Sequence, residues 1–501
     1  MAQRGVVAAG HPLSAEAGAK ILRDGGNAVD AAVAAALASF SLESALTGLG
    51  AGGFMIVGGP RVETAVIDFF VAAPGLGGHD LTGELVPVPV HFDEATTQVF
   101  NAGAASCGVP GTAAGLALAL ERYGSVPMAE LAGPAARLAR EGAPLNRQQA
   151  YVLRILEPIY TATPEARAIY APEGRILGEG DVFRYPELGD ALERLGEEGA
   201  DALCSGEVPR LVEEYILSRG GTLSEADFDA YRPIVRGPVG ARYRGRELLT
   251  NPPPSAGGIL ISFSLAMLGR MEGSGPEQLA RVMRLANEAR QGDFAEALAE
   301  EGFARRFLSP ENLGQASDRL GSTTHLAAMD ASGLCASVTC SNGTGSGMVV
   351  PGTGLHLNNM LGEEDLNPRG FHKSDPGVRI SSMMSPTLIL EDDQVLAGLG
   401  SAGSNRIRSA ILQTTLNLLA GVDPQSAVDA PRIHLEAGLL QAEPGVDEDA
   451  LARIEASGQE VFRWNERNLF FGGVQIVTRD PHTGKLDGAG DPRRGGAVAH
   501  A

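Results

Sequence analysis

Residues 321–359 read GSTTHLAAMDASGLCASVTCSNGTGSGMVVPGTGLHLNN, and this stretch decides how the chain is interpreted. Small hydroxyl residues open it and lead into an extended run that ends at Met329. Residues 330–333 have the chemistry of a tight turn, because Asp hydrogen-bonds to its own turn and Gly accepts a positive φ. A second extended run, 334–341, breaks into a glycine-rich segment at 342–347, where the backbone can be approached closely. The stretch therefore predicts a β-hairpin with a hydroxyl residue at its entry and a polar loop at its exit.

The same stretch and several blocks outside it resemble one known family. The matching residues are Thr323-Thr324-His325, 330–333, Val338-Thr339, Gly354, Asn358-Asn359, and the blocks 25–32, 52–55, 108–112, 252–255, 381–382, 385–387, 400–401 and 491–493. They resemble the γ-glutamyltranspeptidase family, N-terminal-nucleophile hydrolases that cleave themselves immediately before a Thr. The blocks follow the family's order over nearly the whole chain, which is more specific than any single motif. The resemblance implies an α+β fold, a four-layer αββα sandwich of the N-terminal-nucleophile hydrolase type.

The order of predicted elements is compatible with that fold. Strands are expected near both ends of the chain, at 54–57, 64–70, 384–390 and 394–399 in addition to the hairpin, and helices dominate the segment 113–219. Two sheets stacked face to face with helices outside each would bury this pattern. A final strand at 473–478 is predicted to precede a tail rich in Gly and Arg.

Composition excludes several classes of partner. The chain has 501 residues with 44% hydrophobic and 20% charged residues, which are ordinary values for a globular protein. Its net charge of −21 argues against nucleic acid and anionic membranes as partners. No apolar run of about 18 residues is present, so no membrane span is expected. The string GxGxxG occurs at 48–53, but it follows a predicted helix and opens a strand, the reverse of a dinucleotide-binding fingerprint. We expect no cofactor and no metal.

The cysteines and the N-terminal sequence favour a cytoplasmic protein. Cys107, Cys204, Cys335 and Cys340 form no CxxC pair, and the last two project to opposite faces of one predicted strand. Buried, reduced thiols are the expected state. The first residues lack an apolar core followed by a cleavage site, which departs from the many exported members of the family.

The resemblance implies that Thr323 is a nucleophile released by cleavage of the Ser322–Thr323 bond. A Thr hydroxyl needs a base to take its proton, and a newly formed α-amine has a reference pKa of about 7.7–8.0. That amine can serve as the base for its own hydroxyl. Cleavage would give a large-subunit segment, 1–322, and a small-subunit segment, 323–501. We expect the two to form one interleaved structural unit and to stay associated, with a homodimer of them as a further possibility.

The resemblance also assigns supporting residues to the reaction. Thr339 and Ser341 are expected on the neighbouring strand, in hydrogen-bonding reach of the nucleophile. Gly403 and Ser404 precede a predicted helix, where free backbone N–H groups could stabilise an oxyanion. The family has a Gly-Gly pair at that position, so the second donor depends on whether Ser404 can adopt the required φ.

Substrate-contacting residues depart further from the family. Asn342, Glu363, Ser381 and Ser382 match positions that bind the γ-glutamyl group, although Glu363 stands where Asp is typical. Phe70 replaces the Arg that grips the substrate's α-carboxylate, and a Phe side chain provides no charged partner.

The predicted function is an autoprocessing γ-glutamyltranspeptidase-like enzyme of glutathione metabolism. It would cleave a small-molecule amide through an acyl-Thr intermediate and pass the acyl group to water or to an amine. One alternative is an acylase of the cephalosporin or glutaryl type with a different acyl group, and another is a non-enzymatic binding relative.

Overall fold

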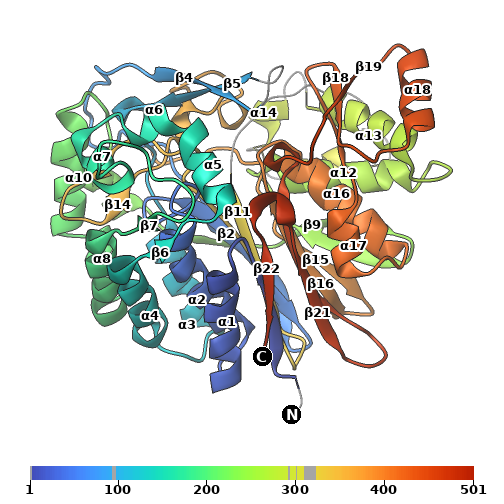
Figure 1. The fold of residues 1–501 in the computed structure, drawn as a ribbon, viewed down its shortest axis with the longest axis horizontal. Helices are drawn as coiled ribbons and strands as arrows, with labels where there is room; N and C mark the ends of the chain where they lie inside the picture. Colours follow the sequence, from blue (N-terminus) through green and yellow to red (C-terminus); the bar gives the residue numbers. More distant parts are fainter. Residues whose placement is uncertain (1–2, 93–96, 291–293, 299, 301, 310–322) are drawn as a thin grey trace.

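Two β-sheets lie face to face and carry helices on both outer sides, as Figure 1 shows. The structure is a computed structural model and describes residues 3–92, 97–290, 294–298, 300, 302–309 and 323–501. The first sheet has seven strands in the order β22 (Ala497–His500), β1 (Gly5–Ala9), β11 (Thr324–Asp330), β12 (Cys335–Ser341), β2 (Gly52–Gly59), β3 (Val62–Phe69) and β8 (Ile234–Arg236). The second has six strands in the order β21 (Leu486–Gly490), β20 (Gly473–Arg479), β16 (Gln394–Ala402), β15 (Thr387–Glu391), β10 (Arg246–Thr250) and β9 (Val239–Tyr243).

Helices cover the outer face of each sheet and complete the αββα sandwich. The helices that pack on the seven-stranded sheet are α1 (Pro12–Asp24), α2 (Ala28–Leu42) and α3 (Thr112–Tyr123), with α4 (Met128–Glu141) and α8 (Pro186–Glu198) behind them. Those on the six-stranded sheet are α12 (Ala256–Leu268), α16 (Arg406–Leu419) and α17 (Pro424–Asp429), with α13 (Pro276–Glu288) and α18 (Glu448–Ala456) farther out. The predicted fold class is confirmed.

The remaining elements are short. They are α5 (Arg147–Ile155), α6 (Glu157–Tyr160), α7 (Pro164–Tyr170), α9 (Asp201–Cys204), α10 (Glu207–Leu217), α11 (Glu225–Ala230), α14 (Phe294–Ala297), α15 (Phe303–Phe307), and the strands β4 (Val86–His91), β5 (Thr97–Ala102), β6 (Ala143–Pro144), β7 (Val182–Phe183), β13 (Val349–Val350), β14 (Leu355–His356), β17 (Ile433–Glu436), β18 (Leu439–Ala442) and β19 (Glu460–Arg463). Within the described part of the chain, no helix combines the length and the apolar character needed to cross a bilayer.

Alternation along the central strands separates the two faces of the seven-stranded sheet. In β11, Leu326 and Ala328 join the core under the helices, whereas Ala327 and Met329 join the core between the sheets. Side chains of a strand point to opposite faces in turn, so every odd-numbered residue of this strand faces the other sheet. Cys335 and Cys340 on β12 divide between the two cores in the same way, as predicted.

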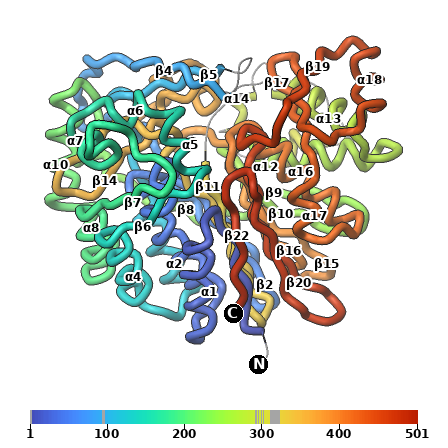
Figure 2. The backbone as a smooth tube through the Cα atoms, in the orientation of Figure 1, coloured from blue at the N-terminus to red at the C-terminus, as the bar shows by residue number. Residues whose placement is uncertain are grey.

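The C-terminal tail is more regular than the sequence suggested. It forms β21 and β22, to which the sequence analysis assigned no strand, and β22 pairs antiparallel with β1. The two termini therefore lie close together (Figure 2). The Gly- and Arg-rich composition of the tail gives no local strand signal. Strand β22 is stabilised by pairing with β1, which lies at the other end of the sequence.

Candidate active site

Thr323 stands immediately before β11, at the start of the central hairpin. The register of this hairpin pairs Thr324 with Cys340 and His325 with Thr339. Continuing it by one residue places Thr323 opposite Ser341, and both belong to the set that faces the other sheet. Thr323 is almost fully buried, with 3% of its surface exposed. Ser322 lies outside the described residues, so the predicted cleavage bond is described on one side only.

His325 is tied to hydroxyl groups of the neighbouring strand. Its Nδ1 is 2.9 Å from Thr339 Oγ1, and its Nε2 is 3.4 Å from Ser337 Oγ. Burial lowers the pKa of His325 to about 3. The ring is therefore neutral at physiological pH and orients Thr339 without offering a base of useful strength.

Thr324 points to the opposite face of the sheet and reaches a residue that the sequence analysis missed. Its Oγ1 donates to Glu43 Oε2 at 2.5 Å, just beyond the end of α2. Burial raises the pKa of Glu43 to about 7, while the hydrogen bond from Thr324 and the charge of Arg494 act in the opposite direction. Glu43 and Arg494 line the same small cavity. The residue next to Thr323 is thus anchored to a buried carboxyl group.

Strand β16 crosses above the hairpin and leads to the loop that holds Gly403 and Ser404. A Cβ built on Gly400 would lie 2.4 Å from Cε1 of His325, so the two strands are in direct contact there. Earlier in the same strand, the Leu399 carbonyl accepts a hydrogen bond from Ser337 Oγ at 3.0 Å. The strand therefore runs toward the Thr323 end of β11. A Cβ on Gly403 would lie 3.6 Å from Nη2 of Arg494, which connects this loop to the Glu43 side of the sheet.

The loop has the geometry that two oxyanion donors require. Gly403 has φ 110° and Ser404 has φ 61°, so Ser404 does adopt the left-handed backbone on which the second donor depends. Helix α16 begins two residues later, at Arg406. Among the described residues, neither the N–H of Gly403 nor that of Ser404 donates a hydrogen bond to the backbone. Both N–H groups are available to a developing negative charge.

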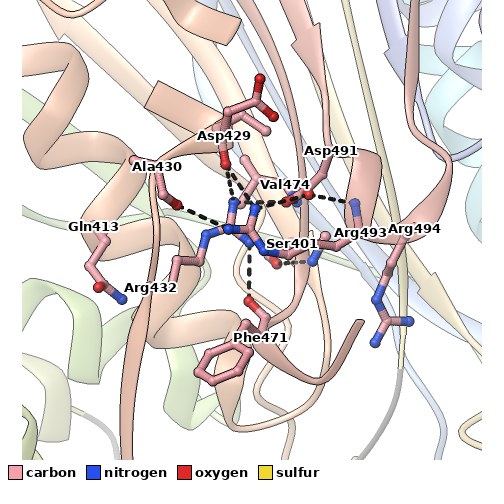
Figure 3. A network of polar contacts seen from close by, with 12 residues as sticks. Ser401, Gln413, Asp429, Ala430, Arg432, Phe471, Val474, Asp491, Arg493 and Arg494 are labelled. Carbon is pink, nitrogen blue, oxygen red and sulfur yellow. Dashed lines mark hydrogen bonds and ion pairs between the residues drawn. The ribbon is translucent and has the colours of Figure 1, made fainter. Parts of the chain in front are cut away.

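A buried ionic network holds the strands behind this loop, as Figure 3 shows. Asp491 accepts from the backbone N–H of Val474 at 2.9 Å and pairs with Arg432 at 2.7 Å and with Arg493 at 3.2 Å. Arg493 also pairs with Glu443 at 2.5 Å. On the adjoining strand, Ser401 Oγ accepts from the Gly473 N–H at 3.1 Å. The network fixes β20 beside β16 and so supports the position of the loop.

Asn342 and Glu363, both predicted to contact the substrate, lie together at the glycine-rich segment that follows β12. A Cβ on Gly343 would meet Oε1 of Glu363 at 2.4 Å, which places this carboxylate against the backbone next to Asn342. Both side-chain polar atoms of Asn342 are buried without a hydrogen-bond partner among the described residues. An amide left in this state is costly unless a ligand satisfies it.

Asp365 is a second acidic candidate that the sequence analysis did not select. It is 1% exposed, and neither carboxylate oxygen has a hydrogen-bond partner in the described part of the chain. Burial raises its pKa against the opposing charge of Arg290. Arg290 also bonds the Asp365 carbonyl at 3.0 Å and Asn405 Oδ1 at 3.2 Å, which ties this carboxyl group to the start of α16. The acidic run at 363–365 was the available signal, but spacing alone could not rank its members.

Phe70 lies in the same row of the sheet as Thr323. Thr323 lies opposite Ser341, and Ser341 pairs with Gly52. Extending the Gly53–Phe69 pairing by one residue places Gly52 opposite Phe70 and completes the row. Three strand spacings separate the ends of this row, about 14 Å. Phe70 is fully buried and stacks on Phe54, with ring centroids 5.3 Å apart.

The two serines that follow Ile380 differ in exposure. Ser381 is half-buried, and Ser382 is buried with its Oγ accepting from the Met384 N–H at 3.1 Å. The Ile380 N–H donates to the carbonyl of Val71, the residue after Phe70, at 3.2 Å. The structure therefore brings the serines to the Phe70 end of the row and Thr339, Ser341 and Thr323 to the other end. Among the described residues, no group of three or more His, Cys, Asp or Glu side chains could hold a metal ion.

Known proteins match nearly the whole chain in sequence and in structure. Residues 14–501 match the family described as Gamma-glutamyltranspeptidase. The chain is 29% identical to the glutathione hydrolase proenzyme of Bacillus subtilis (strain 168), over 99% of this chain and 91% of that protein. It is 30% identical to the Acylase ACY 1 proenzyme of Pseudomonas sp. (strain SE83), over 97% of this chain and 91% of that protein. The solved structure of the cephalosporin acylase from Bacillus halodurans superposes with a TM-score of 0.84 at 27% identity, covering 99% of this chain and 96% of that one.

Proposed function

The chain belongs to the gamma-glutamyltranspeptidase family, and from that premise we propose that Thr323 is the residue before which the chain cleaves itself and the nucleophile of the mature enzyme. The family relationship makes the protein an amidohydrolase or acyltransferase. The observation that carries the assignment of Thr323 is its position. It starts the central hairpin, opposite Ser341, in the face that looks toward the Gly403–Ser404 loop.

Self-cleavage would proceed through an ester. The Thr323 hydroxyl attacks the carbonyl carbon of Ser322, and the peptide nitrogen leaves as the α-amine of Thr323. Water then hydrolyses the ester and leaves Ser322 with a terminal carboxylate. The carbonyl carbon of the broken bond ends in the Ser322 carboxylate, and its nitrogen ends in the Thr323 amine. The same Thr323 hydroxyl serves both self-cleavage and catalysis.

In the mature protein, the α-amine of Thr323 acts as the base. Its reference pKa of about 7.7–8.0 leaves a useful neutral fraction at pH 7. His325 cannot take this role, because burial lowers its pKa to about 3. The amine accepts the hydroxyl proton, the oxygen attacks the substrate amide, and the leaving amine carries the proton away. The acyl group on Thr323 then passes to water or to an acceptor amine, and the N–H groups of Gly403 and Ser404 stabilise each oxyanion.

Phe70 bears on the identity of the acyl group. A carboxylate bound beside Phe70 would lose water without gaining a charged partner, and a hydrogen bond to a charged group contributes roughly 1.5–3 kcal/mol. We therefore propose weak activity on glutathione and other γ-glutamyl amides. The acylase alternative is supported by the same observation, because an uncharged acyl group needs no charged partner beside Phe70. Asn342, Glu363, Asp365, Ser381 and Ser382 are the proposed polar contacts for the acyl donor.

Three anilides that differ by single groups test this proposal. A γ-glutamyl anilide carries an α-amine that a glutaryl anilide lacks, and a butyryl anilide also lacks the carboxylate. We expect kcat/KM to be higher for the butyryl anilide than for the two anilides that carry a carboxylate, and to vanish for all three in Thr323→Ala. The acceptor reaction is measured by adding a small amine and following the new amide by mass spectrometry. Efficient turnover of the γ-glutamyl anilide would contradict the role given to Phe70.

The location of the protein stays a prediction. We propose the cytoplasm, and all four cysteines are free thiols in the structure, which suits a reducing compartment. A homodimer of the cleaved protein is likewise a proposal, and measurement of the native mass tests it.

A further inference from the structure

A cavity lies beside β8, the edge strand of the seven-stranded sheet. Its volume is about 620 Å³. We call it the edge cavity, and its lining includes Val109, Tyr231, Arg232, Arg236, Val378 and Arg379.

Two arginines of the edge cavity share a single buried carboxylate. Asp68 is fully buried and pairs with Arg236 at 2.8 Å and with Arg379 at 3.3 Å. Its Oδ1 already accepts from the Phe70 N–H at 3.0 Å. Two guanidinium groups against one carboxylate leave an excess positive charge. The terminal nitrogens of Arg236 contact no described residue through a hydrogen bond, and its side chain is 26% exposed.

The two other acidic residues of the lining, Asp227 and Glu300, already have local partners. Asp227 accepts four hydrogen bonds, from the N–H groups of Gly75, Leu76 and Ser224 and from the Ser224 hydroxyl. Glu300 forms an ion pair with Arg306. Arg232, Arg236 and Arg379 line the cavity together with Asp227 and Glu300. When Asp68 and Arg306, the partners of these groups, are included, four guanidinium groups stand against three carboxylates, and this local excess of positive charge favours an anionic ligand on a chain whose net charge is −21.

Apolar side chains form the rest of the edge cavity. Leu76, Val378 and Ile234 are 45%, 45% and 38% exposed, which is high for their residue types. The Arg379 guanidinium lies over the ring of Tyr231 at 4.1 Å, so its plane is held in place. A site with fixed guanidinium donors and an apolar wall suits a ligand with a carboxylate at one end and a hydrophobic body at the other.

The edge cavity is separate from the Thr323 site. The buried Phe54–Phe70 stack fills the core between them, and Tyr231 closes the cavity side by donating its hydroxyl hydrogen bond to the Phe70 carbonyl at 2.8 Å. The row from Thr323 to Phe70 alone spans about 14 Å. A small ligand in the edge cavity cannot reach the nucleophile.

We propose that the edge cavity is a binding site for a small carboxylate with an apolar body, held by Arg236 and Arg379 and distinct from the site at Thr323. A guanidinium fork matches a carboxylate with two parallel hydrogen bonds. The remaining nitrogens of Arg236 provide the first of these contacts. The proposal does not depend on the substrate of Thr323.

Calorimetric titration with phenylacetate tests the proposal, with 2-phenylethanol as the neutral and 2-phenylethylamine as the cationic control. The Thr323→Ala protein is used, so that turnover cannot interfere. We expect one phenylacetate per chain and much weaker binding of both controls. Arg236→Gln should weaken phenylacetate binding by about ten- to a hundredfold, the effect of losing a charged hydrogen bond.

Two further variants keep the test decisive if Arg236→Gln disturbs the fold by leaving Asp68 with one partner. Val378→Trp fills the cavity from its exposed rim and should also abolish binding. Arg281→Gln alters a cavity of similar volume, about 610 Å³, between the end of α12 and the start of α13, and should leave binding unchanged. Equal affinity for phenylacetate and 2-phenylethanol, wild-type affinity in Val378→Trp, or absence of binding would each overturn the proposal. Binding of inorganic phosphate that phenylacetate does not displace would assign the arginines to a different anion and also refute it.

Discussion

Ser404 holds its backbone at φ 61°, in the left-handed region where residues with a Cβ are uncommon. From the sequence alone, the Ser404 N–H could be the second oxyanion donor only if Ser404 adopted this angle, because the family has Gly at this position. Asn and Asp adopt this region more readily than Ser, so the surrounding loop must impose it. The contact of Gly403 with Gly472 is one such constraint, since a Cβ on Gly403 would lie 2.8 Å from the Cα of Gly472.

The Gly403–Ser404 loop gives the first prediction. Ser404→Gly keeps the N–H and favours the same φ, so it should turn over substrate like the wild type. Gly403→Ala adds a Cβ at φ 110° and against Gly472, which displaces the loop. Its kcat should fall on the order of 10²–10³, as for the loss of an oxyanion donor. Ser404→Pro is a poor test, because Pro cannot adopt a positive φ. Full activity of a folded Gly403→Ala protein would place the donors elsewhere.

Glu43 gives a pH-dependent prediction. Burial raises its pKa from 4.5 to about 7, so the folded protein binds this proton more tightly than the unfolded chain does. Stability from this group is present below pH 4.5 and is lost as pH rises through about 7. The wild type should therefore lose stability relative to Glu43→Gln between these pH values. Urea unfolding of both proteins at a series of pH values measures the difference, and a difference that does not change with pH would refute the assignment.

Among single residues, the sequence predicted those that belong to a recognisable local motif. The hydroxyls at 323, 339 and 341 were expected on the hairpin, and the register places them on one face. Glu43 and Asp365 were missed for a common reason. Each becomes notable only through burial and through partners far away in the sequence, such as Thr324 for Glu43.

The hairpin of β11 and β12 is the element that the sequence predicted most closely. Its turn was expected at 330–333, and the structure has strands that end at Asp330 and begin at Cys335. Gly25, at φ 105°, ends α1 and Asn27 caps α2 with its side chain, the roles that Gly and Asn favour at helix ends. Strand β22 was missed because an edge strand of four residues has no periodic pattern of its own and is stabilised by pairing with β1.

The ionic network around Asp491 gives a prediction about how β16 and β20 are held together. Asp491→Asn removes the negative charge that Arg432 and Arg493 share in a fully buried site. Breaking a buried pair in this way destabilises a protein by roughly 3–5 kcal/mol. Urea unfolding should show this loss, and Asp190→Asn, which breaks an exposed pair with Arg140, should change stability little. Equal stability of Asp491→Asn and the wild type would show that the network does not hold the strands.

The order of strands in the seven-stranded sheet makes the whole molecule an interleaved unit. β11 and β12, from the segment after Thr323, lie between β1 and β2, from the segment before it. β22 then lies outside β1 at the edge of the sheet. Neither segment could keep this sheet intact without the other. The sequence predicted the sandwich through the family resemblance, but this order arises from long-range pairing that no local pattern encodes.

Interleaving predicts that the two cleaved segments do not separate. Fragments of 322 and 179 residues should co-elute from a sizing column under native conditions and separate only in denaturant. Separation by dilution alone would contradict this arrangement of strands.

The central claim is that Thr323 cleaves the chain and becomes its own N-terminus. Intact-mass analysis and N-terminal sequencing of the purified protein test it most directly. We predict two fragments, one of which begins with Thr323, and a single uncleaved chain for Thr323→Ala. A wild-type protein that stays one chain after prolonged incubation, or a cleaved one whose new N-terminus is a different residue, would contradict the account.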